Sequence, residues 1–126
     1  MKKLLVLFLI VMLTIFSCGK KGNKNELTFV IWDRQQEPAM SAIAREFEKE
    51  NPGIKIKVQV IGWNEYWTKL EASATGGALP DIFWMHSTKF YDYASNNMLL
   101  EVDKNIDNGF KHYPEQLVKL YQFEGK

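Results

Sequence analysis

The chain contains little cysteine and little histidine. Among its 126 residues there is one cysteine, Cys18, and there are two histidines, His86 and His112. A single cysteine permits no intramolecular disulfide. The two histidines are far apart in the sequence, with no cysteine and no paired carboxylate at ligand spacing, so the pattern gives no support to a metal site. We expect no metal and no other cofactor.

Catalytic motifs are also missing. The sequence has no G-x-S-x-G, no H-E-x-x-H and no P-loop. Among 15 acidic residues, some pairs of carboxylates will lie close together by chance, so such a pair alone does not indicate a glycoside hydrolase. We expect a protein that is not an enzyme. An exported polysaccharide-active enzyme stays open as an alternative, although no acid pair stands out to support it.

The chain has no strong charge of either sign. The formal net charge is +1, from 16 basic and 15 acidic residues. Leaving out Lys2 and Lys3, which belong to the segment described next, gives 14 basic against 15 acidic residues and a net charge of −1. This balance argues against a nucleic-acid partner held by net charge.

The first residues are typical of an export signal. Lys2 and Lys3 precede an apolar run over 4–16, which is shorter than the roughly 20 residues of a membrane-spanning helix. Ser17-Cys18-Gly19 follows and resembles the bacterial lipobox. We expect a lipoprotein signal peptide over 1–17, and a lipidated Cys18 with a flexible polar tether over 18–26 that anchors the protein to a membrane. The alternative is an ordinary signal peptide with a chance cysteine.

The remaining chain alternates predicted strands and helices. The strands are 27–32, rich in β-branched and aromatic residues, 54–60, which alternates apolar with polar residues as an edge strand does, and 82–85, an apolar run typical of a parallel strand covered on both faces. The apolar spacing predicts helices over 38–50 and over 64–75, with Asn64 as N-cap and a stop at Gly76-Gly77. Further helices are predicted over about 89–97, capped by Ser87 or Thr88, and from Tyr113-Pro114-Glu115 onward.

Two stretches carry a resemblance to a known family. Residues 66–85 form the pattern Y-W-x-K-L-x-x-x-x-x-G-G-x-x-P-D-I-F-W-M, and residues 46–58 form E-F-E-K-E-N-P-G-I-K-I-K-V. Both are similar to the N-terminal part of the family 1 extracellular solute-binding proteins, over about 27–126. The resemblance implies an α/β fold of the periplasmic-binding-protein type II kind. Because family members have two lobes and are much longer, 27–126 would be a partial N-terminal lobe, from a truncated or partial gene.

The resemblance also implies a function. Family members are the substrate-binding lipoproteins of bacterial ABC importers, which close two lobes on a ligand and then dock to permease subunits. We therefore expect an exported cell-envelope lipoprotein, in the periplasm or on the outer face of the cell membrane, that binds a sugar or oligosaccharide. Proteins of this fold also carry iron, polyamines and phosphorylated sugars. The alternative is a surface lipoprotein that acts as an adhesin or interaction module without a transport role.

The candidate ligand-binding residues lie at predicted strand ends and loops. Aromatic faces stack on the C–H faces of sugar rings, and carboxylate or amide groups fix hydroxyls by hydrogen bonds, which suits a concave site with a few placed polar groups. The candidates are Trp32, Asp33, Gln36, Trp63, Asn64, Trp84 and His86. Core packing is the competing interpretation for each tryptophan, and it is favoured for Trp67, which lies on the apolar helix face. Asp81 is expected to serve the fold.

Overall fold

The computed structural model describes residues 25–102 and 110–125. The predicted signal peptide, Cys18 and most of the tether lie outside these residues. The elements follow in the order β1 (Glu26–Ile31), the 3-10 helix η2 (Arg34–Gln36), α2 (Glu37–Glu50), β2 (Lys55–Val60), α3 (Trp63–Thr75), β3 (Ile82–Phe83), α4 (Ser87–Ser95) and α5 (Glu115–Lys119). The predicted alternation of strands and helices is confirmed.

The three strands form one parallel sheet in the order β2-β1-β3. Phe29 of β1 is in register with Val58 of β2 and with Ile82 of β3, so β1 lies in the middle. The prediction that β2 is an edge strand is confirmed for the described sheet. β2 also alternates as predicted, because Lys55 and Lys57 are exposed while Ile56 and Val58 are half-buried.

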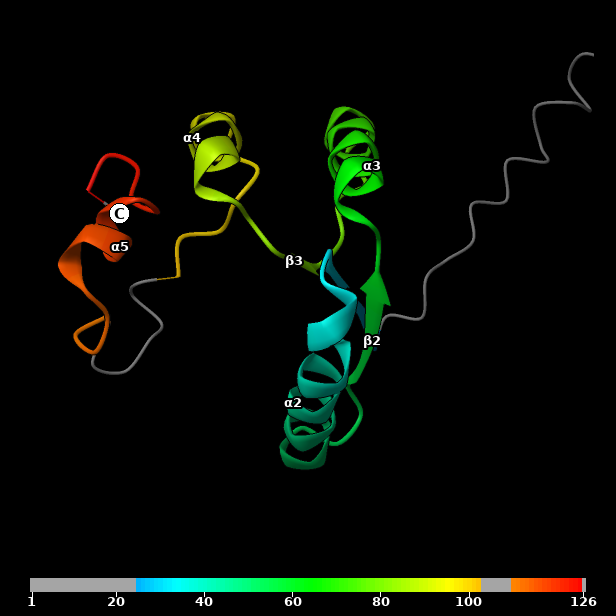
Figure 1. The fold of residues 1–126 in the computed structure, drawn as a ribbon. Coiled ribbons are helices and arrows are strands. Elements are labelled where there is room, and N and C mark those ends of the chain that lie inside the picture. The colour runs from blue at the N-terminus through cyan, green and yellow to red at the C-terminus, as the bar shows by residue number, and fades with distance from the viewer. Residues whose placement is uncertain (1–24, 103–109, 126) are drawn as a thin grey trace, which may run out of the picture.

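Helices lie on both faces of this sheet, with α2 on one side and α3 and α4 on the other (Figure 1). Successive side chains of a strand point to opposite faces. Leu27 and Phe29 of β1 therefore point toward α2, whereas Val30 packs into the core on the α3 side. The carboxyl ends of the strands lead into the loops that carry the candidate residues.

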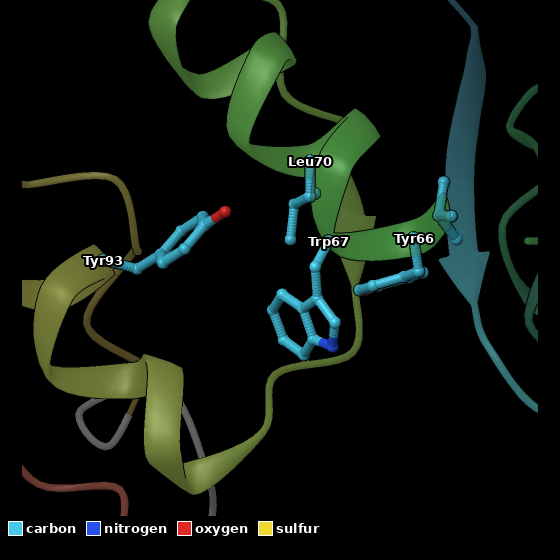
Figure 2. Close-up of a cluster of buried hydrophobic side chains, with 5 residues drawn as sticks. Tyr66, Trp67, Leu70 and Tyr93 are labelled. Atoms are coloured by element: carbon cyan, nitrogen blue, oxygen red, sulfur yellow. The ribbon is translucent and has the colours of Figure 1, made fainter. Parts of the chain in front are cut away.

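The buried core lies between the sheet, α3 and α4. It consists of Val30 of β1 with Tyr66, Trp67, Leu70 and Tyr93. Figure 2 shows the side chains from α3 beside the ring of Tyr93, which reaches across from α4 with its hydroxyl directed toward α3. The predicted apolar face of α3 is confirmed, including the burial of Trp67.

The face that α2 covers buries fewer side chains, among them Ile31 of β1, which is 0% exposed. Ala44 is the buried residue of α2, while Ile43 and Phe47 stay exposed although they follow the helical apolar period. A hollow of about 190 Å³ lies between α2 and the sheet, and one of about 320 Å³ lies on the α3 side, beside Val30, Tyr66 and Leu70. The predicted apolar face of α2 exists, but it is only partly buried.

β3 differs from its prediction. It is parallel, as predicted, but it pairs over only two residues, and Ile82 is 39% exposed on the α2 side. The prediction of a strand covered on both faces is therefore wrong in the described structure. Its apolar composition suggests burial on both sides, but β3 lies at the end of the described sheet, and Ile82 faces the hollow beside α2.

Two predicted helix caps are also wrong. Gly62, not Asn64, occupies the N-cap position of α3, because the helix begins one residue earlier at Trp63 and no side chain caps it. His86, not Ser87 or Thr88, caps α4: its Nδ1 accepts a hydrogen bond from the Thr88 backbone N–H at 3.3 Å. The stop of α3 is as predicted, with Gly77 in the left-handed conformation at φ +64°.

Asp81 joins the start of β3 to β1, which supports its expected structural role. Its Oδ2 accepts hydrogen bonds from the Thr28 backbone N–H at 2.8 Å and from the Thr28 hydroxyl at 2.9 Å. These bonds from the Thr28 backbone and hydroxyl lower the pKa of the Asp81 carboxyl. The turn at Pro80-Asp81 thereby fixes where β3 enters the sheet.

Candidate functional site

Three tryptophans follow the three strands at the carboxyl edge of the sheet. Trp32 comes directly after β1, Trp63 follows β2 by three residues, and Trp84 comes directly after β3. Because parallel strands end at the same edge, these residues are brought together although they are far apart in the sequence. We call this set, with Tyr66, Trp67 and His86, the aromatic cluster.

Trp32 is at the centre of the aromatic cluster. Its ring centroid lies 5.2 Å from that of Trp63, 5.1 Å from Tyr66 and 5.1 Å from Trp84, each in an edge-to-face arrangement. A fourth ring, that of Trp67, is tilted against it at 5.8 Å. Aromatic pairs prefer such edge-to-face geometry. Trp32 is therefore half-buried and supports the rings around it.

Trp63 is the tryptophan that this arrangement leaves most open. It is 46% exposed, while its ring makes edge-to-face contacts with Trp67 and with His86, each at 5.5 Å between ring centroids. It begins α3, directly after the extended Gly62. An indole that is held by such contacts and still open to solvent offers a rigid apolar surface to a ligand at little cost in conformational entropy.

Trp84 is held through its backbone. The Tyr66 hydroxyl donates a hydrogen bond of 2.6 Å to the Trp84 carbonyl oxygen, and the Trp84 N–H donates to the Val30 carbonyl at 3.1 Å. Burial is the main cause that raises the pKa of the Tyr66 hydroxyl, which keeps it protonated as a donor. The apolar spacing over 64–75 predicts that Tyr66 faces inward and does not predict a role at the site. Its polar tip on a buried helix face was the available signal, since a buried tyrosine hydroxyl usually finds a partner.

Asp33 and Gln36 are held together at the start of η2. Asp33 caps this helix, with Oδ1 accepting from the Gln35 backbone N–H at 2.8 Å, and its Oδ2 accepts from the Gln36 side-chain amide at 3.2 Å. Asp33 directly follows Trp32 in the sequence. Its carboxylate accepts one hydrogen bond on each oxygen, so each oxygen keeps a second lone pair that could accept from a ligand hydroxyl.

His86 joins the aromatic cluster, and Asn64 makes no recorded contact with it. The His86 ring packs edge to face on Trp63 while its Nδ1 lies 2.9 Å from the Thr88 hydroxyl. Asn64 is exposed in the first turn of α3, and its backbone carbonyl accepts from the Thr68 hydroxyl at 3.3 Å. The structure thus gathers Trp32, Trp63, Trp84 and His86 at one edge of the sheet. Asp33 follows Trp32 directly in the sequence, and Gln36 lies three residues further on.

The described residues offer nothing to a metal ion or a bilayer span. Within 25–102 and 110–125, no three of the His, Cys, Asp and Glu side chains are grouped so that they could hold a metal. Nor does any helix of that part of the chain combine the length and the apolar character needed to cross a membrane.

Residues 32–122 match the family model of the bacterial extracellular solute-binding proteins. This stretch includes all three strand-end tryptophans and more than half of the chain. The chain belongs to this family. Its members are defined by solute binding, and the aromatic cluster lies at the edge of the sheet where open α/β folds bind ligands.

Solved structures of solute-binding proteins agree with the fold. A family 1 protein from Alicyclobacillus acidocaldarius is 32% identical, with a TM-score of 0.68 over 79% of this chain and 26% of its own. An ABC substrate-binding protein from Listeria monocytogenes, in complex with cycloalternan, is 30% identical, with a TM-score of 0.65 over 79% of this chain and 26% of its own. The predicted fold class, an α/β fold of the solute-binding type, is confirmed.

A further neighbour supports the fold alone. An extracellular solute-binding protein from Staphylococcus aureus, in complex with maltose, is 24% identical, with a TM-score of 0.62 over 84% of this chain and 28% of its own. The chain spans about a quarter of the length of these solved relatives. The described elements therefore correspond to part of one lobe of such a protein.

Proposed function

We propose that this chain contributes the first-lobe side of the ligand cleft in the substrate-binding lipoprotein of an ABC importer, and that the ligand is a sugar or oligosaccharide. The aromatic cluster carries this proposal. It gathers rigid indole rings at the carboxyl edge of a parallel sheet, with an exposed Trp63 at its surface. The cycloalternan bound by the neighbour from Listeria monocytogenes supports the ligand class.

The chemistry of the cluster suits a saccharide. The open face of Trp63 would stack on the C–H face of a sugar ring, with part of Trp84 beside it. Asp33, Gln36 and His86 would supply hydrogen-bonding groups at the margin, and Asn64 another from the first turn of α3. Trp32, which four rings surround, would act mainly by holding Trp63 and Trp84 in place.

The route to the cell envelope belongs to the same proposal. The signal segment over 1–17 would direct export, Cys18 would carry the lipid anchor, and the tether would let the domain reach the permease subunits. Metabolic labelling with a fatty-acid analogue tests this part. We expect the wild-type protein to carry the label and the Cys18→Ser variant to carry none. Label on both proteins would contradict this part of the proposal.

Ligand binding is tested on the full-length protein expressed from its gene. Calorimetric titration with maltose, maltotriose and cycloalternan is expected to give binding to at least one of them. Trp63→Ala is expected to weaken that binding about tenfold, since an aromatic contact with its buried area contributes roughly 1.4 kcal/mol or more.

The matched control is Tyr91→Ala. Tyr91 is an exposed aromatic residue on α4 whose ring contacts Phe123 and not the aromatic cluster. It should leave the affinity within twofold. Binding of no saccharide, together with unchanged sugar uptake in a deletion strain, would refute the proposal and favour the adhesin alternative.

A further inference from the structure

The segment Trp84–His86 connects β3 to α4 and is held from both sides. The Tyr66 hydroxyl of α3 donates to the Trp84 carbonyl at 2.6 Å, and the Tyr121 hydroxyl, just after α5, donates to the Met85 carbonyl at 3.3 Å. Two tyrosines from different parts of the chain thus bond to consecutive carbonyl groups. The connection has no regular secondary structure of its own, so these bonds decide much of its position.

The position of this segment decides where two rings of the aromatic cluster lie. Trp84 packs on Trp32, and His86 packs on Trp63 at the exposed side of the cluster. A shift of the backbone at residue 84 would move both rings relative to Trp63. The carbonyl that Tyr66 binds is therefore linked directly to the shape of the proposed ligand surface.

Tyr66 is well placed to fix that carbonyl. It is 1% exposed, and its ring makes edge-to-face contacts with Trp32 and with Trp67, each at 5.1 Å between ring centroids. A ring so confined has little freedom to move its hydroxyl. Tyr93 of the same core provides a contrast, because its buried hydroxyl has no hydrogen-bond partner within the described residues.

We propose that Tyr66 is a positioning residue for ligand binding: its hydroxyl fixes the backbone at Trp84 and thereby sets the arrangement of Trp84 and His86 around Trp63. This inference rests on the proposed function, in that the arranged surface is the one proposed to bind a saccharide. The geometric part is that the Tyr66 hydroxyl fixes the position of Trp84, and this part does not depend on which ligand is bound.

The geometric part is tested with Tyr66→Phe in the full-length protein, with Tyr93→Phe as the matched control. Both changes remove one buried hydroxyl from the same core, but only Tyr66 has a bonded partner. Tyr66→Phe should shift the indole N–H resonance of Trp84 and change the near-ultraviolet circular dichroism, while far-ultraviolet circular dichroism stays the same. Tyr93→Phe should leave the Trp84 resonance in place. An unshifted Trp84 resonance in Tyr66→Phe would overturn the proposal.

Affinity gives the second readout, with maltose, maltotriose and cycloalternan as probes. Tyr66→Phe should weaken the binding of the saccharide that the wild-type protein binds by about fivefold, the factor that corresponds to one hydrogen bond of ordinary net strength. A Trp84 shift with no saccharide bound by the wild type would refute the proposed function and leave the positioning role supported. Saccharide binding that Tyr66→Phe does not weaken would refute the positioning role for binding.

The wild-type protein provides a measurement if Tyr66→Phe does not fold. A hydroxyl proton locked in the bond to Trp84 should exchange slowly with solvent and show a nuclear Overhauser effect to the Trp84 backbone. A Tyr66 hydroxyl proton in fast exchange would overturn the proposal without any variant.

Discussion

The two faces of the sheet differ in which side chains they bury. On one face, Val30 is buried together with three aromatic rings and a leucine from α3 and α4. On the other face, Ile31 and Ala44 are buried, while Ile43 and Phe47 of α2 stay exposed. α2 and α3 carry the same apolar period, so the period identifies the inward face of a helix and does not determine how far its side chains are buried.

The difference has a consequence for function. The face under α3 supports the aromatic cluster, since Tyr66 and Trp67 belong to both the core and the cluster. The buried residues on the α2 face, Ile31 and Ala44, are not members of the aromatic cluster. Changes on the α2 face should therefore affect ligand binding less than changes on the α3 face.

The largest effect is expected from emptying the packed core. Leu70→Ala removes a side chain that is 3% exposed and should lower the free energy of unfolding by about 2–5 kcal/mol. Ile43→Ala on α2, where the side chain is 60% exposed, should lower it by no more than about 0.5 kcal/mol. Urea unfolding of the two variants and the wild type measures both values. Equal losses of unfolding free energy in the two variants would show that Ile43 contributes as much to stability as Leu70, against this expectation.

A smaller effect is expected from the backbone at the end of α3. Gly77→Ala places a Cβ at φ +64° with nothing within 4 Å of it, so the cost is the left-handed conformation alone, about 1–2 kcal/mol. Gly76→Ala, one residue earlier with φ −81°, should be neutral or stabilising by up to about 1 kcal/mol. Thermal melts of both variants distinguish them. Indistinguishable melting temperatures would mean that Gly77 does not hold this conformation in solution.

The smallest effects are expected from two carboxylates that bond to strand backbone. Asp81 accepts from Thr28 of β1, and Glu48 of α2 accepts from the Ile56 N–H of β2 at 2.7 Å. These bonds are the main reason that the pKa of each carboxyl lies below its ordinary value of 3.8 or 4.5. A lowered pKa means that the stabilisation is present above the ordinary value and is lost as the pH falls through the lowered one.

Urea midpoints between about pH 5 and pH 2 should therefore fall for the wild type, and fall less for Asp81→Asn and Glu48→Gln. Because Asp81 is exposed, we expect a shallow slope for its contribution, whereas the Glu48 side chain is only 17% exposed. A variant curve that runs parallel to the wild-type curve over this range would show that the replaced carboxylate is not linked to folding.

Much of the fold could be predicted from local patterns. The alternation over 54–60 gave an edge strand, the period over 64–75 gave the buried face of α3, and the glycine pair gave its end. Asn97 adopts a left-handed conformation at φ 56°, which asparagine tolerates better than most residues. These features are local, because side-chain period and backbone conformation depend on neighbours in the sequence.

Caps and the burial of β3 were not predictable in the same way. Asn64 has a better capping side chain than Gly62, yet the helix begins at Trp63, where the indole can pack on Trp32. Ile82 is an apolar residue of the kind that usually lies buried, yet it remains exposed because β3 lies at the end of the described sheet. In both cases a contact with a distant segment, or the absence of one among the described residues, outweighed the local preference.

The sequence by itself determined the order of strands and helices, the inward face of each helix and the presence of tryptophans after the strands, because all three depend on residue type and spacing. The tertiary structure decided that Trp32 is surrounded while Trp63 stays open, and that Tyr66 bonds to the Trp84 carbonyl. Those relations join residues from different strands and helices, and only the parallel pairing of β1 with β2 and β3 brings them to one edge.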